Sequence, residues 1–341
     1  MKKFICFMLI LGLVIPVVFA GGSGDKGGNK GVTGKIIIYT SMYEDVIQSV
    51  EKDLQKQFPK CNIEFVYRGT GTHQAKIAAE MAENKLGCDI LLVAEPAYSL
   101  ELKEKGILHS YKSKEASSLA FDYDPEGYWY PVRISKMVLA YNPEKNNKNS
   151  IPNTFRDFAY DARVRGAISM SNPLVSGTTM ATVTALRDKY GYEYFEALNR
   201  QGVTIDSGSV AMTKLENGAY KVIMILEESV LKMRQEGNSK LEVIYPDDGT
   251  VVIPSTIMII NSKWSANSNI KAAEAITDWF LGHEGQSAIV AGWMHSVRAD
   301  SARLPYDAVP SVENMPVNWE NCFRQRDEIQ AKFEEIVIDK R

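Results

Sequence analysis

The sequence has little of what many enzymes and nucleic-acid-binding proteins require. Its 341 residues include only four histidines, and no two of them lie close together along the chain. With 39 basic and 42 acidic side chains, the formal net charge is −3 and the isoelectric point is near 5.9. Because proteins that bind nucleic acid usually carry a clear basic excess, we expect no nucleic-acid partner.

Cysteine is equally scarce, with four in the chain. Cys6 lies in the N-terminal apolar stretch, and no CxxC or Cys/His spacing indicates a zinc site. Cys61 and Cys88 each begin an apolar run, and two interpretations stay open for them: a disulfide formed in an oxidising compartment, or two separate buried thiols. Cys322 is then left without a partner.

The common catalytic motifs are missing as well. The stretch "LVSGT" is not the GxSxG of a hydrolase nucleophile, and "HEGQS" lacks the second histidine of HExxH. Nothing resembles a phosphate loop with its lysine. We therefore expect no enzymatic activity and no cofactor.

The N-terminus predicts export. Residues 1–20 combine a basic start, an apolar run and small residues at positions 18 and 20, which is typical of a signal peptide. Residues 21–34 are glycine-rich and poor in apolar side chains, as flexible linkers are. We expect a periplasmic protein, and an uncleaved leader that tethers it to the membrane remains the alternative.

The remaining part of about 305 residues is long enough for two lobes of ordinary size. From Lys35 onward, short apolar runs alternate with helical periods, and a second such series begins near Gly166. Two long extended runs, 128–143 and 250–260, could cross between the two series. This order predicts an α/β clamshell with mostly parallel sheets and crossover strands at a hinge. The predicted boundaries are 35–135 with 256–305 for lobe 1, 136–255 for lobe 2, and 306–341 for a C-terminal helical segment.

Three predicted helix starts are rich in hydroxyl and glycine residues. A free helix N-terminus offers unpaired N–H groups and a partial positive charge, which suit an anion. Ser41 and Glu44 also have the spacing of a capping box. Each start on its own is more simply a well-capped helix, but two belong to one lobe and one to the other. The candidate residues are Thr40 and Ser41, Thr70 and Gly71, and Ser176, Gly177 and Thr178.

Two acidic residues follow predicted strands in lobe 2. Asp206 begins the turn "DSGSVA", and Glu228 lies in "LEES" after the apolar run "KVIMIL". Carboxylates at such positions can accept hydrogen bonds from ligand hydroxyls or an amine. The alternative interpretation places Glu228 at the surface of a helix N-terminus, where the dipole favours an acidic residue.

Several stretches in order resemble the family-1 extracellular solute-binding proteins of ABC importers. These are "IIIYTSMYEDVIQSVEKDLQKQFP", "GTGTHQAKIAAE", "SNPLVSGTTMATVTAL", "GSVAMTKLENGAYKVIMILEES" and "GWMHSVRAD". The resemblance is to the branch that binds ferric ion, hexose phosphates or 2-aminoethylphosphonate. It implies a type II periplasmic-binding-protein fold, a monomer, and delivery of a small anionic solute to an ABC permease.

The resemblance leaves two ligand classes. Ferric-binding members carry adjacent tyrosines after the strand that matches "KVIMIL", where this chain has Glu228-Ser229; a ferric site here would rely on Tyr43 and Glu95. In the phosphorylated-ligand branch, hydroxyl-rich helix starts hold the phosphate and an acidic residue binds the remainder. The resemblance therefore favours a small phosphorylated solute, with iron as the alternative and no resident metal.

Overall fold

The computed structural model describes residues 31–301, 303–305, 308–309 and 311–339. The predicted signal peptide and residues 21–30 of the predicted linker lie outside this part. Within the described residues, no helix combines the length and apolar character needed to span a membrane.

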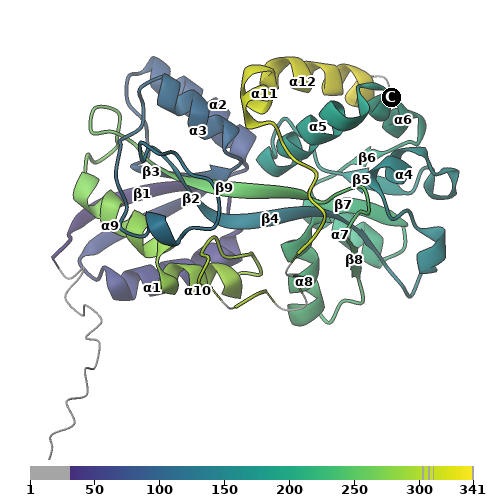
Figure 1. Ribbon diagram of the computed structural model, residues 1–341, viewed down its shortest axis with the longest axis horizontal. Coiled ribbons are helices and arrows are strands. Elements are labelled where there is room, and N and C mark those ends of the chain that lie inside the picture. The colour runs from purple at the N-terminus through teal and green to yellow at the C-terminus, as the bar shows by residue number, and fades with distance from the viewer. Residues whose placement is uncertain (1–30, 302, 306–307, 310, 340–341) are drawn as a thin grey trace, which may run out of the picture.

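One mixed sheet runs through the whole molecule (Figure 1). Its strand order is β2-β1-β3-β9-β4-β7-β5-β6, and β8 pairs with β4. The pairs at the two ends, β1 with β2 and β3 and β5 with β6 and β7, are parallel, whereas the central pairs that involve β4 and β9 are antiparallel. The predicted two-lobed α/β fold is confirmed, with the refinement that both lobes share one continuous sheet.

Lobe 1 surrounds three parallel strands that alternate with helices. β3 and the second half of β1 are buried on both faces, as parallel strands between helices are, whereas burial alternates along the edge strand β2. In Figure 1, α2 and α3 lie above the sheet and α1, α9 and α10 lie below it. The elements are β1 (Gly34–Thr40), α1 (Glu44–Gln57), β2 (Cys61–Tyr67), α2 (Thr70–Ala82), β3 (Ile90–Ala94), α3 (Ala97–Glu104), η1 (Ala116–Ser118), α9 (Ile270–Leu281) and α10 (His283–Ala291).

Lobe 2 has the same layered construction around β5 and β7. Helix α5 is buried on nearly every side, and Gly191 ends it with a φ of 71°, a left-handed conformation that glycine adopts without strain. The elements are η2 (Lys148–Ser150), α4 (Phe155–Tyr160), η3 (Ala162–Val164), β5 (Ile168–Met170), α5 (Gly177–Tyr190), α6 (Glu193–Arg200), β6 (Thr204–Ile205), α7 (Gly208–Glu216), β7 (Val222–Leu226), α8 (Glu227–Glu236) and β8 (Glu242–Ile244).

Two long strands connect the lobes. They are β4 (Tyr130–Tyr141) and β9 (Val251–Ile259), which coincide with the two extended runs expected from the sequence. They pair antiparallel from Tyr130 opposite Ile257 to Met137 opposite Val251, with an irregularity between Pro131 and Arg133. The predicted lobe boundaries would cut these strands near their middles, and those boundaries stay a prediction.

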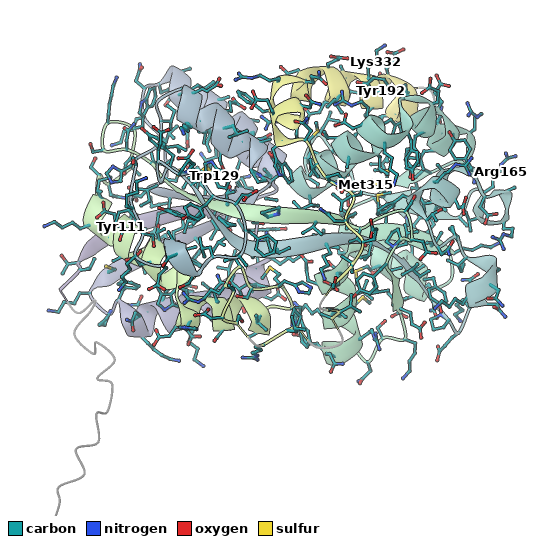
Figure 2. The ribbon with its side chains drawn as sticks, viewed as in Figure 1. Tyr111, Trp129, Arg165, Tyr192, Met315 and Lys332 are labelled. Atoms are coloured by element: carbon teal, nitrogen blue, oxygen red, sulfur yellow. The ribbon has the colours of Figure 1, made fainter. Side chains whose placement is uncertain are left out.

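The C-terminal segment joins lobe 2 but reaches lobe 1. It contains α11 (Trp319–Arg324), α12 (Arg326–Phe333) and a π-helical turn, η4 (Glu334–Ile338). Cys322, Ile329 and Phe333 are fully buried in the core of lobe 2. Before α11 the chain passes the hinge strands, where the Met315 N–H donates to the Thr250 carbonyl at 2.9 Å; Met315 is labelled near the middle of Figure 2.

The three cysteines in the described part of the chain are separate thiols. Cys61, Cys88 and Cys322 are all free and buried. Of the two interpretations left open for Cys61 and Cys88, the disulfide is therefore wrong. Burial raises the pKa of the Cys61 and Cys88 thiols, which keeps them in the unreactive protonated form.

The packing of α12 predicts that Phe333 is needed for stability. Its ring lies edge-on to Phe195 with centroids 5.6 Å apart, and no part of it is exposed. Phe333→Ala should lower the free energy of unfolding by about 3–5 kcal/mol because it leaves a cavity in the core. Denaturant unfolding measures this.

The neighbouring residue supplies a matched control. Lys332 points outward at the top of Figure 2, and its ion pair with Glu335 is half exposed. Lys332→Ala should change the unfolding free energy by less than about 0.5 kcal/mol. Equal effects of the two substitutions would contradict the assignment of α12 to the core of lobe 2.

Candidate ligand-binding site between the lobes

The lobe 1 side of the site is formed where β1 and β3 end and α2 begins. The Ser41 Oγ and the Thr70 Oγ1 both accept the backbone N–H of Ala94, at 3.2 and 3.3 Å. The Thr40 Oγ1 accepts the N–H of Met42 at 3.1 Å. These contacts bring the predicted residues Thr40, Ser41 and Thr70 together and fix the position of their hydroxyl groups.

The predicted capping box at α1 is wrong. Helix α1 begins at Glu44 after Tyr43, and Tyr43 makes no side-chain cap. Ser41 does not cap this helix because its hydroxyl is used by Ala94. Since Glu44 and Asp45 occupy the first turn, the N-terminus of α1 is a poor place for an anion.

The lobe 2 side is the start of α5. Ser176 is the N-cap, and its Oγ accepts the N–H of Thr179 at 3.2 Å. The same oxygen lies 3.1 Å from the Thr178 Oγ1. Neither α2 nor α5 carries an acidic residue in its first turn, so both N-termini keep their partial positive charge without a neighbouring carboxylate.

The two helix starts touch across the lobes. The Gly71 N–H donates to the Val175 carbonyl at 3.1 Å. At Gly177 an added Cβ would lie 2.8 Å from the Cβ of Thr70, and at Gly71 it would collide with the Leu174 carbonyl oxygen. Glycine is therefore required at both positions for this close approach, and the lobes are closed on each other here.

The hinge strands contribute a polar surface next to these helix starts, which we call the junction floor: Arg133 and Ser135 on β4 and Ser255 on β9. Ser255 lies opposite both Ala94 on β3 and Arg133 on β4. The Arg133 Nε donates to the Ser255 Oγ at 2.9 Å, and the Ser135 Oγ donates to Glu228 Oε1 at 2.8 Å. The predicted residue Glu228 therefore belongs to the same group.

Two tyrosines of lobe 1 lie close to this floor. Burial raises the pKa of Tyr43, the Glu228 charge raises it further, and a hydrogen bond with Ser229 opposes both effects. Tyr43 as a whole residue is 37% exposed. Burial also raises the pKa of Tyr67, and Arg133 opposes that shift. Burial likewise raises the pKa of Glu228.

Two predicted site residues are engaged elsewhere. Glu95 has no exposed surface; Arg326 and Gln74 each donate to its Oε1 at 3.3 Å, and burial raises its pKa to about 7. Asp206 accepts hydrogen bonds from Lys214 and, at 2.5 Å, from Tyr220. Burial acts to raise the pKa of Asp206, but these hydrogen bonds outweigh it and lower the pKa. Neither carboxylate forms a hydrogen bond or ion pair with a junction-floor residue, so the geometry gives no support to their predicted roles.

The sequence interpretation overlooked Arg133, Ser135, Ser255 and Tyr67. A short signal was available: in "VRIS", residues 132–135, polar side chains alternate with apolar ones, which is the period of a strand with one polar face. For the metal alternative, no group of three or more His, Cys, Asp or Glu side chains among the described residues is arranged to hold an ion.

Comparison with known proteins identifies the class. The sequence profile of a family described as bacterial extracellular solute-binding protein matches residues 88–322. This chain belongs to that family. Membership implies a small solute as ligand, delivery of that solute to an ABC permease, and a periplasmic location.

Individual relatives of this solute-binding protein agree with the family. The probable ABC transporter periplasmic-binding protein y4fP of Sinorhizobium fredii is 20% identical over 293 residues, 80% of this chain and 78% of y4fP. AfuA from Actinobacillus pleuropneumoniae, solved with fructose-6-phosphate, is 20% identical with a TM-score of 0.78 over 89% of this chain and 98% of AfuA. Iron-bound HitA from Pseudomonas aeruginosa is 19% identical with a TM-score of 0.75 over 89% and 99%. At these identities the structures establish the fold alone.

The contact between α2 and α5 predicts a closure variant of this solute-binding protein. Gly71→Ala should favour the open form because its methyl group meets the Leu174–Val175 backbone, while alanine stabilises α2 itself by up to about 1 kcal/mol. We expect a larger radius of gyration in small-angle X-ray scattering together with an undiminished melting temperature. Ala78→Ser, on an exposed part of α2, should leave the scattering unchanged, and an unchanged radius for Gly71→Ala would contradict this closed contact.

His73 predicts a pH effect on stability. It is fully buried below Thr40, with its Nε2 3.1 Å from the Thr40 carbonyl, and burial lowers its pKa. The unfolded imidazole titrates near 6.5, so below about that pH the unfolded chain takes up a proton that the folded chain resists. Stability should therefore fall as the pH drops from 7.5 to 5.5.

Denaturant unfolding of the unsubstituted protein and His73→Gln at both pH values isolates this effect. The glutamine variant should lose less stability over the same interval because it has no imidazole to protonate. Identical pH slopes for the two proteins would show that His73 does not contribute.

Proposed function

We propose that this protein is the receptor of an ABC importer for a small phosphorylated organic solute, a sugar phosphate or an aminoalkylphosphonate. It would act as a monomer, capture the solute by closure of the two lobes and release it to the permease. Its role would be binding without chemical conversion of the solute.

One observation carries the proposal: the N-termini of α2 and α5 come from opposite lobes and meet through Gly71 and Val175. Both have hydroxyl residues at their first positions and no acidic residue in the first turn. Two such termini suit an anion with several oxygen atoms, such as a phosphate group. Because one terminus lies on each lobe, binding of the anion would favour closure.

The residues after β7 support an organic ligand. In place of a pair of tyrosines the chain has Glu228 and Ser229, which Glu227 precedes. Glu227 is occupied: its Oε2 lies 2.6 Å from His295 Nε2, and Tyr245 donates to its Oε1. Glu228 is 4% exposed, and its Oε1 accepts a hydrogen bond from the Ser135 hydroxyl. Acceptor capacity remains on this carboxylate for a ligand hydroxyl or amine.

Ferric iron is the second candidate, favoured by one specific observation. Tyr43, Tyr67 and Glu228 lie close enough for Glu228 and Tyr67 to shift the pKa of Tyr43, and phenolate and carboxylate oxygens suit a hard ferric ion. Arg133 weakens this candidate because its positive charge acts on the same tyrosines. A ferric ion there would need an accompanying anion.

Calorimetric titration separates the two candidates. The unsubstituted protein is titrated with glucose 6-phosphate, 2-aminoethylphosphonate and ferric citrate. The proposal expects binding of at least one phosphorylated compound. Binding of iron with a visible tyrosinate charge-transfer band, and of neither phosphorylated compound, would overturn it.

Glu228 gives a sharper prediction within that titration. Glu228→Ala should weaken the organic ligand by about 1–3 kcal/mol, because a buried hydrogen-bond partner is lost. Glu242→Ala, at an exposed position of lobe 2, serves as the control with unchanged affinity. Equal affinities of the Glu228 and Glu242 variants would show that Glu228 does not bind the ligand.

A further inference from the structure

Three arginines are buried among the described residues, and one of them differs from the other two. Arg298 pairs with Asp300 and Glu115, both at 2.7 Å, and Arg326 pairs with Glu101 at 2.6 Å and Glu95 at 3.3 Å. Arg133 is the most buried of the three, with 4% of its surface exposed. Within the described part of the chain, no carboxylate oxygen lies within 4.0 Å of its guanidinium nitrogens.

The contacts of Arg133 are with neutral groups. Its Nε donates to the Ser255 Oγ at 2.9 Å, and its Nη1 to the Met294 Sδ at 2.8 Å. A thioether is a weak acceptor, and a guanidinium has five N–H donors arranged to bind a planar or tetrahedral anion. A buried charge without a partner is costly, so this arginine is not explained by the stability of the protein alone.

Arg133 also lies in the right place. On the sheet it is opposite Ser255, which is opposite Ala94, and the Ala94 N–H is shared by Ser41 and Thr70 at the start of α2. Cross-strand pairing therefore places Arg133 two strands away from Ala94, the residue that holds the hydroxyl groups at the start of α2. These hydroxyl groups form the lobe 1 part of the proposed anion site. Arg133 lies on the hinge strand β4, which belongs to both lobes. Its positive charge therefore lies at the junction between them.

Glu228 does not neutralise Arg133 directly. The charges of the two side chains act on each other's titration, but their charged atoms are more than 4.0 Å apart. Ser135 holds the Glu228 carboxylate and Ser255 holds the guanidinium. The two opposite charges are therefore kept separate by hydroxyl groups on the hinge strands instead of collapsing into an ion pair.

We propose that Arg133 binds the anionic group of the ligand and that this residue determines the preference of the site for an anion. The inference rests on the proposed function and names the residue that would supply the positive charge. The hydroxyl groups and N–H groups of α2 and α5 would orient the anion, and the guanidinium would replace its lost hydration. An uncharged analogue would lack this contact.

The test compares Arg133 with a buried cation on the same strand. Lys136 is 5% exposed and three residues along β4, and its Nζ donates to the Val309 carbonyl at 2.9 Å. Arg133→Gln, Arg133→Lys and Lys136→Gln are titrated with glucose 6-phosphate, 2-aminoethylphosphonate, inorganic phosphate and glucose. Melting temperatures of each variant are measured without ligand and with each compound.

For the phosphorylated compound that binds the unsubstituted protein, Arg133→Gln should weaken affinity about 100-fold or more. Arg133→Lys should retain part of it because lysine keeps the charge but loses the planar fork, and Lys136→Gln should bind normally. Without ligand, Arg133→Gln should melt no lower than the unsubstituted protein, since no ion pair is lost. If Arg133 only stabilised the fold, Arg133→Gln would instead melt at a lower temperature than the unsubstituted protein.

The outcomes distinguish the inference from the proposed function. If the unsubstituted protein and Arg133→Gln bind the phosphorylated compound equally, the inference is overturned and the proposed function stands. If Arg133→Gln melts at a lower temperature without ligand, and Arg133→Lys restores the melting temperature and the affinity together, then affinity follows stability and the inference is overturned in favour of a structural role. If neither the solutes nor inorganic phosphate stabilises the unsubstituted protein, both proposals fail.

Discussion

The antiparallel ladder between β4 and β9 is the constraint on which the remainder of the structure depends. Each lobe is built from parallel strands, whose carboxyl ends meet at one edge of the sheet. Because the two crossing strands lie between β3 and β7 in the sheet order, the β1–β3 edge of lobe 1 and the β7 edge of lobe 2 are brought to the same region. The strands must also remain paired when the lobes move, so their central residues can carry polar side chains that loops could not hold in position. Arg133, Ser135 and Ser255 occupy these positions, where backbone pairing fixes their register.

Electrostatics at this junction differs from that in the surrounding protein. The other two buried arginines among the described residues are paired with carboxylates, Arg326 with Glu101 and Arg298 with Asp300. At the junction, a guanidinium and a carboxylate are held by serine hydroxyls and separated. Such an arrangement gives up stability that direct pairing would provide. A ligand that binds both the guanidinium and the carboxylate would gain this free energy on binding. Because α2 and α5 touch only when the lobes are closed, such binding would also favour closure.

Much of the architecture could be predicted from the sequence. The apolar runs of 35–40 and 221–226, the helical period of α1 and the glycine that ends α5 are local signals, and Ser176 indeed caps its helix. The site was less accessible because side-chain partners are set by the fold. Glu95 follows a strand as a ligand residue would, yet its partner Arg326 lies 231 positions away. Ser41 and Glu44 have the spacing of a capping box, but the Ser41 hydroxyl oxygen instead accepts the backbone N–H of Ala94. The sequence predicted that residues 128–143 cross between the lobes, but it gave no indication that Arg133 in this run would be buried without a carboxylate partner.

A crystal structure of the protein with a bound phosphorylated solute tests the central claim most directly. The phosphorus atom should lie beside the touching first turns of α2 and α5, with its oxygen atoms within hydrogen-bonding distance of Thr70, Thr178 and the Arg133 guanidinium. The organic part of the solute should lie towards Glu228. A ferric ion bound by Tyr43, Tyr67 and Glu228 in crystals grown with both iron and the solute, or a solute bound away from the junction floor, would contradict it.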